Sequence, residues 1–373
     1  MQEPGKCNLK IHILDVRHRH RSSSVDTVRE LADRIAKGLD APFNKKTLPS
    51  MILYDEVGLL LYDKFSAETP EYYPFGAEME ILKMRADEIV QVMHVRSNSA
   101  IVPGEVVVEL GAGSLRKTSH LLRALSNIVP IPSHVPPVTY FALDLDESEL
   151  RRTLNEIHIS DIGPSLAGKG TYESGLEFIV VRKLGSSGQE DECAPFRPAF
   201  GPDITSARPG HLPLHLFFLG GTIGSFHRGE DAHHDNKREE LELTYDNPKG
   251  HNKVFVLNGL DVAGKTLGSP GLFDRDNWDF FRHYDEDKRC IEGFYKCLRS
   301  YEISLPGYNR SVQFLQGEFV QVTVSTKYSE SDISALLADA QLKPIQHWVD
   351  STNRHSLWLL ERPLITTAQS PFA

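Results

Sequence analysis

The stretch VVVELGAGSLRKT, residues 106–118, decides the fold. An apolar run ends in an acid, a Gly-x-Gly turn follows, and a helix start comes next. Gly111 and Gly113 let the backbone turn tightly and approach a ligand, and the amino end of a helix offers free N–H groups. The stretch therefore predicts a strand, a turn and a helix that bind a nucleoside.

Short apolar runs continue outward from this stretch and predict a parallel sheet. They are IVPGEVVVEL (101–110), TYFALDLD (139–146), LEFIVVRKL (176–184) and LPLHLFFLGG (212–221). Runs of this length suit buried strands, and KTSHLLRALSNIV (117–129) supplies a connecting helix. We expect an α/β fold with a Rossmann-like sheet, helices on both of its faces, and a smaller inserted α+β lobe.

The outer parts of the chain add further elements to this core. Residues 10–18 alternate like a strand, and residues 25–40 have helical spacing. Two helical stretches, 45–65 and 76–93, are separated by the aromatic segment TPEYYPFG, whose prolines and glycine should interrupt regular structure. Residues 333–363 predict a helix and two strands at the edge of the same sheet.

These patterns predict four parts of the chain. They are an N-terminal extension (1–44), a core with an N-terminal helical cap (45–236), a substrate-binding lobe (237–322) and the C-terminal part of the sheet (323–373). Within the core, residues 185–213 are rich in proline, glycine and charge, so we expect a flexible surface loop there.

Bulk composition bounds the class of protein. The chain has 373 residues, a net charge of −10 and no apolar run long enough for a membrane span. This predicts a cytoplasmic protein that binds neither nucleic acid nor membrane, with the basic run 17–21 read as a solvated segment rather than a nucleic-acid arm. The oligomeric state stays open, with a monomer as one alternative.

Cysteine and histidine spacing gives no metal prediction. The four cysteines are scattered and form no C-x-x-C pair, so we expect reduced thiols without a disulfide framework or a zinc site. His233 and His234 are adjacent, which does not place both side chains on one helical face, so we interpret them as solvated.

The turn after residue 110 discriminates between nucleoside cofactors. Arg116 occupies the third glycine position of a dinucleotide fingerprint, which leaves an NAD-dependent oxidoreductase as a remote alternative. The E-L-G-x-G form is similar to the adenosylmethionine loop of class I methyltransferases. Asp144 ends the next apolar run, where a carboxylate could accept both ribose hydroxyls, although either feature alone could be an ordinary turn or cap.

Five stretches carry a resemblance to a known family. They are residues 48–65 with 69–82, ELGAGSLRKT (109–118), FFLGGTIGSF (217–226), LTYDNPKGHNKVFVLNGL (243–260) and GEFVQVTVSTKY (317–328). In these the chain resembles the histidine Nα-methyltransferases of ergothioneine biosynthesis and the fungal dimethylallyltryptophan N-methyltransferases. The resemblance implies a class I methyltransferase sheet, S-adenosylmethionine as cofactor and a small amino-acid-like substrate.

The resemblance also implies roles for individual residues. Contacts with S-adenosylmethionine fall on Tyr72, Gly111, Gly113, Lys117, Asp144 and Tyr172, the last near the adenine. Contacts with the acceptor fall on Tyr54, Tyr62, Ser225, Tyr245, Gly293, Thr323 and Ser325. Tyr245 would hold the substrate carboxylate and orient the acceptor as the catalytic residue. Core packing remains the alternative for the tyrosines, and a solvated helix position the alternative for Lys117.

Three pocket positions depart from the histidine enzymes. Ser225 stands where they have Asn, Gly293 replaces a larger apolar residue, and Thr323 sits where an acid would grip the imidazole. Losing a charged hydrogen-bond partner costs about 1.5–3 kcal/mol. Histidine is therefore a doubtful substrate, and Gly293 indicates space for a bulkier or more apolar one.

A further departure concerns the sheet. Between GTIGSF and YDN the family has a helix and a strand, and on the order of twenty to twenty-five residues of it are missing here, judged by average element lengths. The leading hypothesis is an N-methyltransferase of an amino acid or a derived metabolite, with an aromatic one favoured. The alternatives are a histidine Nα-methyltransferase and a non-catalytic adenosylmethionine-binding relative with a degenerate pocket.

Overall fold

The computed structural model describes residues 12–16, 24–96, 105–128, 138–156, 166–182, 214–225 and 250–363. The helices are α1 (Ser24–Leu39), α2 (Glu56–Glu68), α3 (Tyr73–Arg96), α4 (Thr118–Ile128), α5 (Glu147–Glu156), α6 (Tyr172–Arg182), α8 (His251–Thr266) and α9 (Glu330–Asp339), with short 3-10 turns η2 (Ser50–Leu53), η4 (Thr222–Ser225) and η5 (Arg275–Asn277). The strands are β1 (His12–Asp15), β2 (Glu105–Leu110), β3 (Val138–Asp144), β4 (Leu166–Lys169), β5 (Leu214–Phe217), β6 (Trp278–Asp285), β7 (Cys290–Cys297), β8 (Tyr301–Leu305), β9 (Arg310–Phe314), β10 (Phe319–Thr326), β11 (Lys343–Val349) and β12 (Ser356–Glu361).

A five-stranded parallel sheet forms one half of the molecule. Its order is β1-β4-β3-β2-β5, and every neighbouring pair is parallel. The quoted run VVVEL lies in β2, whose six residues are all buried because the strand has neighbours on both edges and cover on both faces. The expected α/β class is confirmed.

Helices cover both faces of this sheet, as expected. On one face Leu82 and Val90 of α3 and Leu122 of α4 join a core that includes Val107 of β2. On the other face, Phe178 of α6 stacks on Phe141 of β3 with ring centroids 5.8 Å apart. The two apolar layers hold the carboxyl ends of the strands in place for a site.

One predicted strand is wrong. Residues 176–184 were expected as a strand, but they lie largely in helix α6, because a short apolar run suits a buried helix as well as a strand. The strand at this point is β4, whose sequence LAGK is too weakly apolar to stand out. β4 fits beside β3 because residue 168 is glycine. A Cβ at this position would lie 2.6 Å from the Phe141 ring, so a larger residue would clash with it.

Of the two helical stretches before the sheet, the first begins later than expected and the second begins earlier. The first does not start at residue 45: η2 comes first, and α2 begins after Asp55, whose carboxylate accepts from Gly58 N at 2.8 Å and from Asn258 Nδ2 of α8 at 2.7 Å. The second already begins at Tyr73, because Pro74 is tolerated in the first turn of a helix.

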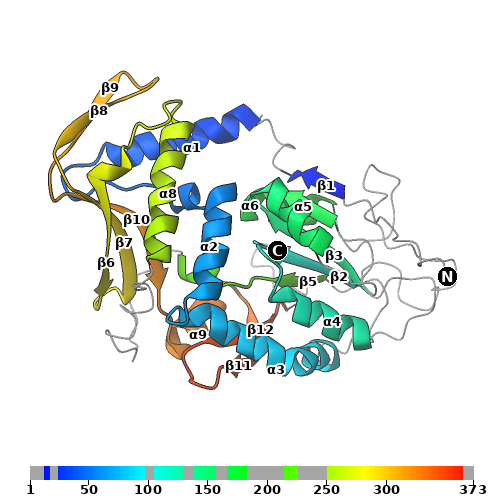
Figure 1. The fold of residues 1–373 in the computed structure, drawn as a ribbon. Coiled ribbons are helices and arrows are strands. Elements are labelled where there is room, and N and C mark those ends of the chain that lie inside the picture. The colour runs from blue at the N-terminus through cyan, green and yellow to red at the C-terminus, as the bar shows by residue number, and fades with distance from the viewer. Residues whose placement is uncertain are drawn as a thin grey trace, which may run out of the picture.

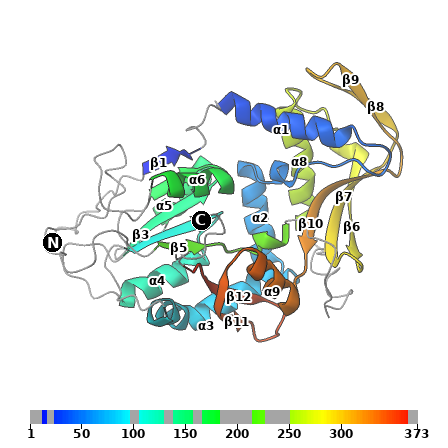
Figure 2. The same ribbon diagram turned by 180° about the vertical axis from the view of Figure 1, so that it is seen from behind.

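A second lobe lies beside the parallel sheet. It holds the antiparallel sheet β10-β7-β6, the hairpin β8-β9 and α8, and Figures 1 and 2 show it on the opposite side of α2 from the parallel strands. Ile35 and Leu39 of α1 are buried in the core of this lobe. The N-terminal extension thus joins both halves, because β1 pairs with β4 in the parallel sheet while α1 packs with the second lobe. β10 runs across the boundary expected at residue 322.

The C-terminal strands correct another expectation. Within the ranges that the structure describes, β11 and β12 form a two-stranded antiparallel sheet and pair with no strand of the parallel sheet. They pack on α3, where Trp348 Nε1 donates to Glu88 at 2.9 Å. Among the described residues β5 is the edge of the parallel sheet, and its Leu214 and Leu216 are 38% and 49% exposed.

Several expectations fall outside the described residues. They concern the loop 185–213, the basic run 17–21, the apparent loss of a helix and strand after Phe226, His233 and His234, and Tyr245. In the part of the chain that the structure describes, no helix is both long and apolar enough to cross a bilayer.

Candidate active site

One large cavity opens at the carboxyl ends of the parallel strands and reaches into the second lobe. Its volume is about 1470 Å³, and its walls include the turn after β2, the aromatic residues before α3, and strands β7 and β10. Pockets for a single small ligand usually measure about 300–1,000 Å³. The cavity therefore has room for two small molecules side by side.

The glycine turn and Asp144 lie together at one end of this cavity. Gly113 N donates to Asp144 Oδ2 at 2.9 Å, and Leu145 N donates to Oδ1 at 2.7 Å. Burial raises the pKa of Asp144 above its ordinary value, while these backbone donors pull it back. Asp146 N is a third backbone donor to this carboxylate, which has about four acceptor sites, so Asp144 keeps some capacity to accept from ligand hydroxyls.

Gly111 allows a close approach that no other residue would. Its φ is +75°, and a Cβ there would lie 2.8 Å from the Tyr172 hydroxyl oxygen. Its N–H donates to the carbonyl of Leu143 at 2.9 Å, which ties the turn to the end of β3. Gly111, Gly113, Asp144 and Tyr172 all line the cavity, so the structure brings these expected cofactor residues together.

Glu109 is a buried acid beneath the turn. Its carboxylate accepts from Thr118 Oγ1 at 2.6 Å and from the Tyr140 hydroxyl in a very short hydrogen bond. Burial raises the pKa of Glu109 to about 7, although both hydrogen bonds lower it. The folded chain therefore holds this carboxyl partly protonated at neutral pH.

Lys117 lines the cavity but already has an anionic partner. Its Nζ lies 2.6 Å from Glu78 Oε2, and the same carboxylate accepts from Gly220 N at 2.9 and 3.1 Å. Burial lowers the pKa of Lys117, but Glu78, Tyr62 and Glu109 together raise it, so the net shift is upward. The ammonium stays charged and joins α3, α4 and the loop after β5.

Aromatic rings form one wall of the cavity. Tyr54, Tyr62 and Tyr72 stand in series, with ring centroids 6.1 and 6.4 Å apart, and Phe255 of α8 packs 5.5 Å from Tyr62. The hydroxyls of Tyr62 and Tyr72 lie 3.3 Å apart. Faces of aromatic rings attract cations and exclude water, so this wall suits a positively charged ligand.

The space expected beside Gly293 is already filled, which corrects the sequence analysis. Gly293 and Thr323 are paired across β7 and β10, and a Cβ on Gly293 would lie 2.2 Å from Thr323 Oγ1 and 3.1 Å from the Phe280 ring. The missing Cβ at Gly293 therefore makes room for the side chains of Thr323 and Phe280, and it does not widen the cavity. The acceptor wall at this point is a hydroxyl next to a ring.

Ser225 and Ser325 lie on facing elements at the same end. Ser225 is the last residue of η4, and η4 packs closely on β10. The contact is so close that a Cβ on Gly224 would lie 3.0 Å from the carbonyl oxygen of Thr326. Lys327 Nζ donates to Ser325 Oγ at 2.8 Å. Both serines line the cavity, and the ammonium beside them makes this corner suitable for an anionic group.

Two further residues, one beside the cavity and one in its wall, have no signal in the sequence. Glu78 is 3% exposed and holds Lys117, yet it lies in an ordinary helical stretch that carries no motif. His355 precedes β12, and burial lowers the pKa of its imidazole, so the neutral form that can accept a proton dominates at neutral pH. Only the three-dimensional arrangement of the chain reveals either residue.

Comparison with known proteins gives one family. Residues 31–237 and 229–362 match the model of a family described as histidine-specific, SAM-dependent methyltransferases. The two matches meet at residues 229–237, inside the region where family elements were expected to be missing.

Named relatives come from fungi. The L-tryptophan methyltransferase of Psilocybe serbica is 31% identical over 376 residues, covering 93% of this chain and 97% of that protein. The 4-dimethylallyltryptophan N-methyltransferase of Claviceps fusiformis is 38% identical over 54% of this chain and 46% of that protein. Ergothioneine biosynthesis protein 1 of Schizosaccharomyces pombe is 24% identical, covering 90% of this chain and 41% of that protein.

Proposed function

This chain belongs to the family of histidine-specific, SAM-dependent methyltransferases, and from that premise we propose that it methylates the amino group of an aromatic amino acid or of a metabolite derived from one. The observation that carries the proposal is the single cavity shared by the glycine turn with Asp144 and by the apolar, hydroxyl-bearing wall of the second lobe. The likeness to a tryptophan methyltransferase over nearly its whole length supports an aromatic acceptor.

The residues at the sheet end fit S-adenosylmethionine. Asp144 would accept the ribose hydroxyls, and the bare backbone at Gly111 would let the adenosyl group lie against the turn with Tyr172 beside it. Tyr62 and Tyr72 would face the cationic sulfonium. When bound, the cofactor supplies a methyl group on that sulfur.

The residues at the other end would bind and align the acceptor. Phe280 and Tyr54 offer apolar surface for an aromatic side chain, and Lys327 with Ser325 offers donors for a carboxylate. Alignment of a neutral amine with the methyl group is the main task of such an enzyme. His355 lines the same cavity and is neutral because it is buried, so it would take the amine proton directly or through water.

A methylation assay tests this proposal. The purified protein is incubated with S-adenosylmethionine and, separately, tryptophan, tyrosine, phenylalanine and histidine, and products are identified by mass. We expect methylated product with at least one aromatic amino acid and little with histidine. Preference for histidine would replace the proposal with a histidine Nα-methyltransferase.

A binding experiment separates an inactive relative from an inadequate panel. S-adenosylhomocysteine is titrated calorimetrically into the wild type and into Asp144→Ala. Binding without any methylated product, after tryptamine and other aromatic amines are added to the panel, would favour the non-catalytic relative.

A further inference from the structure

Three side chains that could hold a metal ion meet at the edge of the parallel sheet opposite the cavity. They are His94 near the end of α3, Glu105 at the start of β2 and His215 in β5. The glycine turn follows the other end of β2, about 20 Å away at ~3.3 Å per strand residue. The cluster is therefore separate from the active site.

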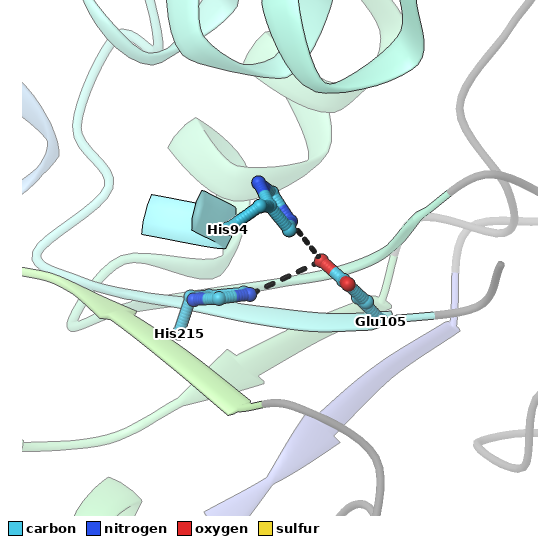
Figure 3. Close-up of side chains that lie close together, drawn as sticks. All are labelled: His94, Glu105 and His215. Atoms are coloured by element: carbon cyan, nitrogen blue, oxygen red, sulfur yellow. Dashed lines mark hydrogen bonds and ion pairs between the residues drawn. The ribbon is translucent and has the colours of Figure 1, made fainter. Parts of the chain in front are cut away.

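The three side chains converge on one point, as Figure 3 shows. His94 Nε2 lies 2.8 Å and His215 Nε2 lies 3.1 Å from the same oxygen, Glu105 Oε2. One ligand atom from each residue falls within 4.8 Å of the other two. Two imidazole nitrogens and a carboxylate oxygen in this arrangement are the donor set that Zn²⁺ and similar divalent ions prefer.

The hydrogen bond on the far side of one imidazole supports this donor set. His94 Nδ1 lies 2.6 Å from the carbonyl oxygen of Val90, which can only accept, so Nδ1 carries a hydrogen. The other nitrogen, Nε2, faces Glu105 as one half of a buried ion pair, and a metal ion would replace its proton. An imidazole fixed by a carbonyl in this way is the usual supporting contact of a metal-bound histidine.

Burial makes a cation at this point favourable. Glu105 has no exposed surface and His94 is 5% exposed, so the buried carboxylate charge needs a cation beside it, a role that the paired His94 fills and that a metal ion would take over. The His215 side chain is 17% exposed, so an ion can enter on that side and water can complete its coordination.

We propose that His94, Glu105 and His215 form a structural site for a divalent transition metal ion, with Zn²⁺ as the best-suited occupant. The ion would join α3, β2 and β5 at one point. β5 has a strand neighbour on only one side among the described residues, so it gains the most from such a link. Binding to the folded chain would add to its stability.

Zinc titration of the full chain tests the proposal. The protein is freed of metal with a chelator, and Zn²⁺ is titrated while heat and the melting temperature are recorded. We expect one tightly bound equivalent and a rise in melting temperature of several degrees. Binding of Co²⁺ should give the visible absorption bands of a four-coordinate site.

Substitution at the partly exposed ligand locates the ion. His215→Ala should lower zinc affinity at least a hundredfold and abolish the rise in melting temperature. His120→Ala, a partly exposed histidine of α4 outside the cluster, is the matched control and should keep both effects.

The buried ligand supplies a second variant. Glu105→Gln keeps the shape of the side chain but not its charge, and it should also lower zinc affinity. S-adenosylhomocysteine binding, measured on each variant, reports whether the fold is intact. A folded wild type that binds no zinc, or a folded His215→Ala that binds it as tightly as the wild type, would overturn the proposal.

Discussion

The two ends of the cavity are built in different ways. The end that we propose for the cofactor depends on the turn at Gly111 and Gly113 and on Asp144, which neighbouring backbone N–H groups hold in place. The acceptor end depends on side chains that meet across strands, such as Gly293 with Thr323. A substitution at the first end should therefore have an effect of its own on binding. Substitutions of residues that meet at the second end should have effects that depend on one another.

The largest expected effect concerns the carboxylate at the cofactor end. Asp144→Ala should weaken binding of S-adenosylhomocysteine by about 10²–10⁴-fold, because two hydrogen bonds to a charged group are lost and each is worth about 1.5–3 kcal/mol. Titration calorimetry measures the loss. Asp146→Ala is the control, since Asp146 caps α5 by accepting from Glu149 N at 2.8 Å. Equal weakening in both variants would contradict the assigned role.

A smaller effect concerns the buried acid under the turn. The pKa of Glu109 rises from 4.5 to about 7 on folding, so the folded chain keeps a proton that the unfolded chain has released. The free energy of unfolding should therefore fall as pH rises from about 4.5 to about 7, by on the order of 3 kcal/mol from this group.

Substitution isolates that pH dependence. Glu109→Gln cannot titrate, so the difference in unfolding free energy between wild type and variant should change across this window and level off above it. Urea unfolding at a series of pH values measures this difference. Glu302→Gln, at an exposed position of β8, is the control. A wild type and a Glu109→Gln variant with parallel pH profiles would contradict the raised pKa.

The smallest effect concerns the paired contact at the acceptor end. Gly293→Ala should destabilise the fold by about 1–3 kcal/mol and raise the KM for the acceptor, because the new Cβ meets Thr323 Oγ1. Thr323→Ala in the same chain should remove most of both effects. A double-mutant cycle of unfolding energies and KM values measures the coupling.

Two controls sharpen this cycle. Gly76→Ala places a methyl group where no atom lies within 4 Å, so it should not destabilise the fold. Affinity for S-adenosylhomocysteine should stay unchanged in Gly293→Ala, because the substitution lies at the other end of the cavity. Additive effects of Gly293→Ala and Thr323→Ala would show that the two positions do not act together.

The sequence by itself determined the elements whose signals are local. β2, the glycine turn, α4 and the acid after β3 follow from consecutive residues, because apolar runs and glycines restrict the backbone wherever they stand. Those same elements place Gly111 and Asp144 at neighbouring strand ends, so the cofactor end could be predicted before the fold was known.

Tertiary structure alone decided the features that join distant segments. Residues 176–182 became part of helix α6 because the place in the sheet belongs to β4, and the last two strands pack on α3 as a hairpin of their own. Thr323 and Phe280 fill the space at Gly293, and Glu105 meets a histidine 110 residues further along the chain. Such contacts depend on how segments pack, and no pattern of neighbouring residues encodes them.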